Sequence, residues 1–267
     1  MTRFIALFVA LVAGVGVAVW YYRAPVDGMP AAIVRNDDRW MEGLQSRAPK
    51  QVEEATAQLE ERGTAALPVI RRTLQDAAAE PGDKQAALKA TAILGVRAAE
   101  ALPDVAAVLH EPDFAPEAAL ALSFMGSPAV PALQDAVNSN NEIVRREALR
   151  ALGKLRERAS IDPKLVVPLL LRAVDDPDPT VRHVAVTYLG IVRDEPAAAV
   201  KGLIEALADE SPEVRQAAAA ALAEYGAAAE RAIPALKKAA GDADEDVRRE
   251  AGRTLVHLSE IKKEPSR

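Results

Sequence analysis

A nine-residue pattern, Val-Arg-x-x-Ala-x-x-x-Leu, recurs along this chain of 267 residues and constrains its fold more than any other feature. It begins at Val144, Val181, Val214 and Val247, so the arginines follow one another at steps of 37, 33 and 33 residues. A fixed period of this size indicates a repeat array, in which each unit buries its apolar face against its neighbours. The chain is therefore expected to form a stack of similar units.

A second marker keeps step with the first: an apolar residue followed by proline. Proline is tolerated in the first helical turn, where its missing N–H bonds nothing, so each marker predicts the start of a second helix. The markers are Leu67-Pro68, Leu102-Pro103, Val130-Pro131, Val167-Pro168 and Ile233-Pro234. The fifth unit departs from the pattern, because residues 200–203, Val-Lys-Gly-Leu, take the place of the marker and contain no proline. Weaker matches upstream place Val52, Ala87 and Ala118 in the position that the arginine holds in the later units. Together with positions 145, 182, 215 and 248, they predict seven units.

The residues around the arginine predict how each first helix begins and packs. The residue four before it has a short polar side chain suited to an N-cap, because its oxygen accepts a bond from a free helix N–H. These residues are Asn141, Asp178, Ser211 and Asp244. The alanine three residues after the arginine lets adjacent helices approach closely, and the leucine one turn later fills the interior. Aromatic residues make up only 4% of the chain, which suits stacked small helices.

The full unit, Asp-x-Asp-x-x-Val-Arg-x-x-Ala-x-x-x-Leu-Gly followed by Ala-x-Pro-x-Leu, resembles the HEAT-like repeats of the phycobilisome-lyase type. The resemblance covers residues 47–260 and is closest in the last four units. It implies an all-α fold, a right-handed alpha-alpha superhelix of about seven helix pairs, whose second helices line the concave side. A linker and N-terminal cap are expected at residues 25–46 and a polar tail at residues 261–267.

The recurring arginine admits two interpretations, a ligand-binding ladder or a structural tie. A cation in the first turns of a helix opposes the helix dipole and should seek a carboxylate. Aspartates occur six residues before three of the arginines, in the loops between units. We therefore predict that each arginine ties its own loop to a neighbouring unit. The residues of this repeat ladder are Arg145, Arg182, Arg215, Arg248, Asp176, Asp209 and Asp242.

Residues 1–24 are predicted to hold a membrane anchor. Residues 4–22 carry no charge and lie between Arg3 and Arg23, and as a helix they would span ~28 Å, close to the hydrocarbon thickness of a bilayer. A cleaved signal peptide, with Gly16-Val17-Ala18 as its cleavage site, is the alternative. A three-residue tail normally stays inside, so the rest of the chain is expected outside the cytoplasm, in the periplasm of a bacterium.

Composition argues against several classes of function. The chain has no cysteine, and its net charge of −6 with few aromatics does not suit a nucleic-acid binder. Its three histidines fall in different units, so no metal site is expected. Deoxyhypusine hydroxylase, also built of HEAT-like repeats, holds iron with several His-Glu pairs, but only His110-Glu111 occurs here. No catalytic motif is found, and we expect neither a cofactor nor enzyme activity; an accessory enzyme of the bilin-lyase or hydroxylase kind is the alternative.

The exposed positions of the second helices are the remaining candidate for function. Most follow the marker prolines by three or four residues, while Lys201 and Glu205 come from the fifth unit, which lacks that proline. Together they should form a mixed, partly basic groove that accepts an acidic or extended peptide. They are Arg71, Arg72, Gln134, Arg172, Lys201, Glu205, Lys237 and Lys238. The sequence thus predicts a membrane-tethered scaffold that binds a partner protein. Mere solubility of these side chains, with the chain acting as a structural spacer, is the competing interpretation.

Overall fold

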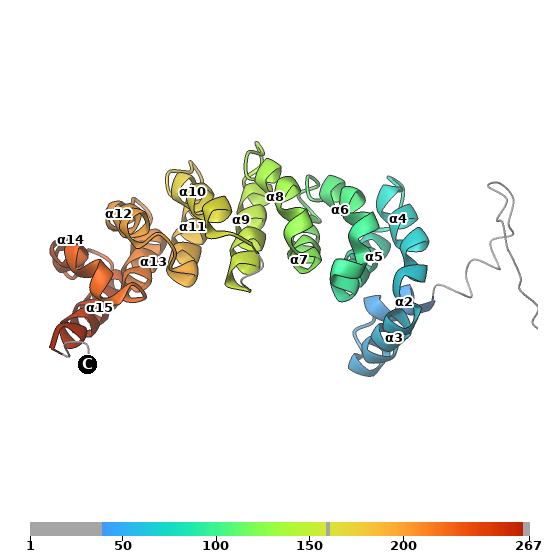
Figure 1. The fold of residues 1–267 in the computed structure, drawn as a ribbon, viewed down its shortest axis with the longest axis horizontal. Helices are drawn as coiled ribbons and strands as arrows, with labels where there is room; N and C mark the ends of the chain where they lie inside the picture. The colour runs from blue at the N-terminus through green and yellow to red at the C-terminus, as the bar shows by residue number, and fades with distance from the viewer. Residues whose placement is uncertain (1–38, 159–160, 264–267) are drawn as a thin grey trace, which may run out of the picture. The chain divides into compact units, whose positions relative to one another are not determined.

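The computed structural model describes residues 39–158 and 161–263, and all regular structure in these ranges is helical (Figure 1). The predicted anchor at residues 4–22, the linker as far as residue 38 and residues 264–267 lie outside the described residues. None of the helices within 39–158 and 161–263 combines the length and the apolar character needed to cross a bilayer.

Two kinds of helix alternate along the repeat unit. The first helices of the repeats are α3 (Pro49–Arg62), α5 (Pro81–Leu94), α7 (Ala115–Met125), α9 (Glu142–Glu157), α11 (Pro179–Val192), α13 (Pro212–Ala223) and α15 (Glu245–Lys263). The second helices are α4 (Leu67–Gln75), α6 (Leu102–Val108), α8 (Val130–Ala136), α10 (Pro163–Ala173), α12 (Pro196–Ala206) and α14 (Ile233–Ala239). A short helix, α2 (Arg39–Gln45), precedes them.

The helix starts follow the predicted signals closely. Asn141, Asp178, Ser211 and Asp244 all accept backbone N–H bonds with their side chains, so the predicted N-caps are confirmed. Four second helices, α4, α6, α8 and α14, begin one residue before the marker proline. A turn of 3-10 helix joins first to second helix in these four units, at Gly63–Ala66, Gly95–Ala101, Ser127–Ala129 and Gly226–Ala232.

Two expectations about the helices were wrong. Helix α10 begins at Pro163 and holds Pro168 in its interior, because the Asp162 side chain caps the helix more than a turn before the marker proline. The described residues also contain six helix pairs rather than seven, since no second helix follows α15. The predicted array of helix pairs is otherwise confirmed, and it forms one compact unit from Trp40 onward.

The first helices pack side by side along the row, each against the first helix before and after it (Figure 1). The repeated alanine makes this possible: Ala148, Ala185, Ala218 and Ala251 are fully buried between neighbouring units. The second helices contact one another much less, so the row is packed more tightly along its first-helix edge. In Figure 1 the row bends toward its first helices, and the second helices lie along the looser edge, on the outer side of the bend at the top. The expectation that the second helices line a concave side is therefore wrong.

Two glycines inside first helices allow a neighbouring helix to come closer still. A Cβ added at Gly153 of α9 would lie 2.1 Å from the Tyr188 ring of α11, and one at Gly190 would lie 2.8 Å from Ala221 Cβ of α13. A buried hydrogen bond also joins α11 to the residue two positions after α13. The Tyr225 hydroxyl donates to the Leu189 carbonyl at 2.6 Å. The C-terminal units are thus joined by close contact and by polar ties.

The N-terminal end of the row is covered by α2. Trp40, Met41 and Leu44 of this short helix are buried in the common core. Lys89 of α5 donates to the Leu44 carbonyl at 3.0 Å, and a Cβ at Gly43 would meet Ala55 of α3 at 2.6 Å. A linker and N-terminal cap are expected from the sequence at residues 25–46, and α2 lies at the end of that range.

Candidate functional site

Three of the repeated arginines bridge to the aspartate in the loop of the following unit. In each bridge Nε and Nη2 of the arginine donate to the two carboxylate oxygens of one aspartate at 2.7–2.9 Å. The pairs are Arg145–Asp176, Arg182–Asp209 and Arg215–Asp242. Such a two-point contact between guanidinium and carboxylate fixes orientation as well as distance. The Arg182 and Asp209 side chains are only 8% and 10% exposed.

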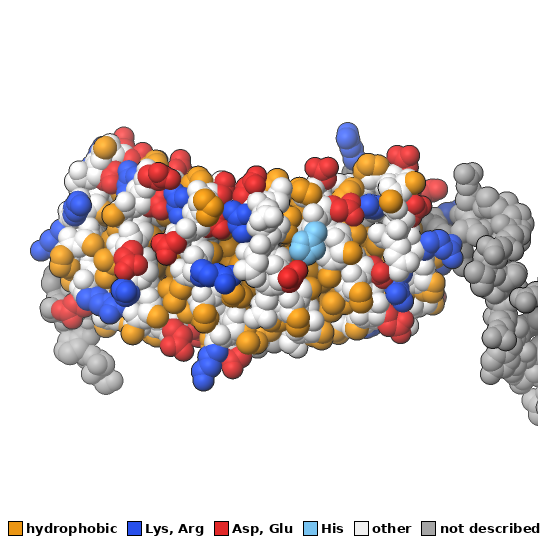
Figure 2. All heavy atoms as spheres, turned by 90° about the horizontal axis from the view of Figure 1, so that it is seen from above, with side chains coloured by type: hydrophobic (Ala, Val, Ile, Leu, Met, Phe, Trp, Pro, Cys, Tyr) orange, Lys and Arg blue, Asp and Glu red, His pale blue; other side chains and the backbone are white. Residues whose placement is uncertain are grey.

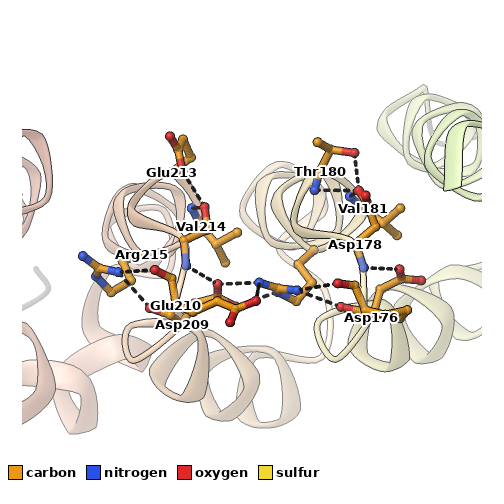
Figure 3. A network of polar contacts seen from close by, with 12 residues as sticks. Asp176, Asp178, Thr180, Val181, Asp209, Glu210, Glu213, Val214 and Arg215 are labelled. Carbon is orange, nitrogen blue, oxygen red and sulfur yellow. Dashed lines mark hydrogen bonds and ion pairs between the residues drawn. The ribbon is translucent and has the colours of Figure 1, made fainter.

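The third guanidinium nitrogen holds the arginine's own loop. Nη1 of Arg182 donates to the Asp176 and Pro177 carbonyls at 3.0 and 3.2 Å, and Nη1 of Arg215 donates to the Asp209 carbonyl at 2.8 Å. Figure 3 shows carboxylates and loop carbonyls alternating from one unit to the next. Each aspartate also accepts the N–H two residues on, as Asp209 does from Ser211 at 2.8 Å. Every inner arginine therefore contacts two successive loops.

In the Arg182–Asp209 and Arg215–Asp242 bridges these contacts shift the pKa values of both partners. The hydrogen bond to Asp209 raises the pKa of Arg182, and the bond to Asp242 raises the pKa of Arg215, while the bond from Arg215 lowers the pKa of Asp242. For Asp209, burial acts to raise the pKa, but the bonds from Arg182 and the Ser211 N–H outweigh it, so the pKa is lowered. These two carboxylates are thus held in their charged form.

A bridge of the same kind occurs in the second unit, where the sequence analysis missed it. Lys84 stands four residues after the α5 N-cap Glu80, as the arginines do after theirs, and its Nζ donates to Glu111 in the next loop at 2.9 Å. It also lies 5.3 Å from the centre of the Phe114 ring. The sequence pattern assigns the arginine position of this unit to Ala87, which lies three residues after Lys84. Pro81, at the first position of α5, is the signal that would have given the correct register. The third unit has Ala118 there and forms no bridge.

The predicted partner surface lies along the second-helix edge. Arg72, Lys201, Glu205, Lys237 and Lys238 are exposed, and Gln134 is half-buried. Two other members of the set tie units together: Arg71 donates to Asp104 of α6 at 2.7 Å, and Arg172 donates to Asn138 at 2.8 Å. Figure 2 shows this edge with basic and acidic side chains interspersed among apolar ones. The structure therefore places these residues on one exposed edge, and no large single-sign patch is visible there.

An open groove of about 630 Å³ lies on the first helices, where α9, α11 and α13 end. Ile191, Ala217 and Ala220 form its apolar part, and Arg193 and Glu224 pair across its rim at 3.6 Å. Arg193 has a positive φ of 50°; at four other connections of the row the residue with a positive φ is a glycine. The sequence analysis did not predict this groove; its one signal was that the fifth unit departs from the repeat pattern.

Histidine and carboxylate side chains are not gathered into a centre that could hold a metal. His110, His183 and His257 are all exposed, on different units, and His110 lies 3.6 Å from Asp135. In the part of the chain that the structure describes, no three potential ligands come together. The arrangement that the structure does offer is a stack braced by charged bridges, with two exposed edges.

Comparison with known families places repeats in the region of the ladder. Residues 144–176 match the PBS lyase HEAT-like repeat, and residues 200–265 match HEAT repeats. Comparison with curated protein sequences gives no match. The chain therefore contains HEAT-like repeats, as its sequence pattern predicts.

Several solved structures are similar to this chain. The archaeal HEAT-like repeats protein from Thermococcus onnurineus is similar over 90% of this chain and 99% of its own, with 14% identity and a TM-score of 0.53. Kap121p is similar over 87% of this chain and 28% of its own, with 17% identity and a TM-score of 0.58. The complex of CpcE and CpcF of phycocyanin lyase from Nostoc has 25% identity over 58% of this chain and 98% of that one, with a TM-score of 0.49.

Proposed function

We propose that this protein is a non-catalytic scaffold that binds a partner protein along its second-helix edge. The carrying observation is the placement of Arg72, Gln134, Lys201, Lys237 and Lys238, which come from α4, α8, α12 and α14 and share one exposed or half-buried edge. Three of the four repeated arginines of the first helices are already engaged in bridging the loops. A repeat row offers an extended surface without needing a larger core, which suits the binding of another chain.

The proposal that the protein is not an enzyme is supported by the chemistry of its exposed groups. The three histidines are far apart in the sequence and each lies exposed on its own unit. The rim of the groove is formed by charged side chains that pair with one another, as Arg193 does with Glu224. A bilin-transfer assay and a measurement of bound iron test the alternative, and turnover or stoichiometric iron would contradict the proposal.

We further propose that residues 4–22 tether the repeats to a membrane, with the repeats in the periplasm. The support is the uncharged run of that length between two arginines. The test is protease treatment of intact cells and of spheroplasts that carry the full chain. Cleavage of the repeats only after the outer barrier is opened is expected. A repeat region that resists protease until the spheroplasts are lysed would contradict this orientation.

Site-specific crosslinking in cells tests partner binding. A photoreactive residue is placed at Lys237 or Arg72 on the second-helix edge, and at His183 of the first helix α11 as the matched exposed control. Crosslinks from the two second-helix positions to one and the same protein, absent from the control, are expected. The paired variant Lys237→Glu, Lys238→Glu should reduce them. Equal crosslinking from all three positions, or none, would contradict the proposed surface.

A further inference from the structure

The last arginine of the ladder is held in position but lacks the carboxylate that the others bind. Nη1 of Arg248 donates to the Asp242 and Ala243 carbonyls, both at 2.8 Å. Arg215 makes the equivalent contacts to its own loop, at 2.8 and 3.0 Å. Nε and Nη2 of Arg248, which in the inner bridges bind both aspartate oxygens, have no partner within residues 39–158 and 161–263. Arg248 is accordingly exposed, whereas Arg182 is buried.

The surface around Arg248 lies on the face by which an inner first helix receives its neighbour. In α11, Gly190 approaches Ala221 of the next first helix. The equivalent position in α15, eight residues after the ladder arginine in both helices, is Val256, which is 58% exposed and holds a neighbour farther away than a glycine does. A Cβ built at Gly252, one turn before it, meets nothing within 4 Å. The α15 face is therefore a docking face of the repeat with no described neighbour upon it.

The charge of this face specifies what can cover it. Arg248, Arg249 and Arg253 are all exposed on α15; Arg249 and Arg253 pair with Asp246 and Glu250 of the same helix, whereas Arg248 presents two free donors. The inner bridges show what such donors bind: a carboxylate in a loop that precedes a helix, fixed by an N–H two residues on. A second copy would bring either the same face, which sets one Arg248 against another, or the end that α2 already covers.

We infer that the α15 face binds a partner protein through an acidic loop at the start of a helix, whose aspartate or glutamate engages Arg248 as Asp242 engages Arg215. This inference rests on the proposed scaffold function and specifies one contact of the partner. The contact extends the ladder by one bridge, so the partner stacks on the end of the row as a further unit does. Val256 supplies the apolar part of the contact, and the unpaired charge of Arg248 favours a carboxylate.

The test uses a peptide of this chain as the probe. A fluorescent peptide of residues 207–225 carries the Asp209 loop and the α13 helix, the element that docks on α11 within the row. Its binding to the full chain in detergent is followed by fluorescence anisotropy. Arg248→Gln in the protein, or Asp209→Asn in the peptide, is expected to weaken binding at least about tenfold. Arg97→Gln, an exposed arginine in the turn between α5 and α6, is the matched control and should leave binding unchanged.

Each alternative outcome contradicts the inference. Equal affinity for the wild-type chain and Arg248→Gln, or no binding up to about 1 mM peptide, would overturn it. A fall in the molecular mass of the assembly on Arg248→Gln would assign the face to a second copy instead. Because Arg248 is exposed, circular dichroism should show the variant folded. If the peptide fails to bind while second-helix crosslinks to a partner persist, the inference fails and the proposed function stands.

Discussion

The C-terminal half of the row, α9 to α15, and the N-terminal half, α3 to α8, stack by different means. In the C-terminal half, the three ladder bridges link each unit to the next, and a further arginine–aspartate bridge joins Arg156 to Asp194. In the N-terminal half the first helices have one bridge, Lys84–Glu111, and Glu111 is 44% exposed. Alanines pack the interfaces of both halves, for example Ala118 and Ala218, each fully buried.

The difference shows that apolar packing is sufficient to stack these units, while the charged bridges fix how adjacent loops sit. A lone bridge between exposed groups adds little stability, but breaking a buried one leaves an uncompensated charge. The C-terminal half should therefore depend on its carboxylates and arginines far more than the N-terminal half. Because each unit contacts only its neighbours, disruption of either half should stay local.

Acidification should give the largest effect, because it affects several bridges at once. The pKa values of Asp209 and Asp242 are lowered in the folded chain, so the stability they contribute is present above the unfolded value of about 3.9. It is lost as the pH falls through the lowered values. Hydrogen exchange at decreasing pH should show α11–α15 losing protection before α3–α8. Equal loss in both halves would contradict the comparison.

Gly153→Ala tests the close packing of the C-terminal half without touching a charge. The new Cβ would lie 2.1 Å from the Tyr188 ring, so we expect a loss of about 1–3 kcal/mol in the free energy of unfolding. Gly252→Ala is the matched control, because its Cβ has open space and the substitution favours helix by about 0.5–1 kcal/mol. Urea unfolding measures both. A harmless Gly153→Ala would mean that α9 and α11 are less closely packed than described.

Lys84→Ala tests the single bridge of the N-terminal first helices. The lysine side chain is 8% exposed, but its partner Glu111 reaches solvent, so we expect a loss of about 1 kcal/mol. Lys50→Ala removes an exposed pair with Glu54 one helical turn away and should change stability by only a few tenths of a kcal/mol. Thermal unfolding compares them. A larger loss than that of any C-terminal bridge would reverse the proposed contrast.

Arg248→Ala should have the smallest effect of the series on stability. The side chain is exposed and contacts only its own loop within the described residues, so we expect a change within about 0.5 kcal/mol. The same thermal unfolding experiment measures it. A loss comparable to that of an inner arginine would indicate that Arg248 already has a partner within the chain.

Much of the fold followed from the sequence because the repeat signals are local. The N-caps at Asp178 and Ser211 depend on the residues beside them, and those predictions held. The start of α10 was missed because Asp162 and Pro163, an equally local signal, lie before the expected marker. The register of α5 was misplaced because its bridge uses lysine and glutamate, which do not match the arginine pattern.

The surfaces were harder to predict, because they depend on how the units stack. The groove beside Ile191 arises where three first helices end together, and no local pattern encodes that meeting. The contact between Gly153 and Tyr188 joins residues 35 positions apart across two helices. The edge on which the second helices lie follows from the closer packing of the first helices, which the repeat pattern does not specify.

A double-mutant cycle on Arg182 and Asp209 tests most directly whether the ladder braces the stack. The full chain in detergent, Arg182→Ala, Asp209→Ala and the double variant are compared by urea unfolding, with hydrogen exchange in α11 and α13 as a local measure. Because both side chains are nearly buried, we predict a coupling energy of about 2 kcal/mol and reduced protection of these two helices. A coupling within about 0.5 kcal/mol, with partner binding lost in Arg182→Ala, would show that the arginine serves a ligand instead.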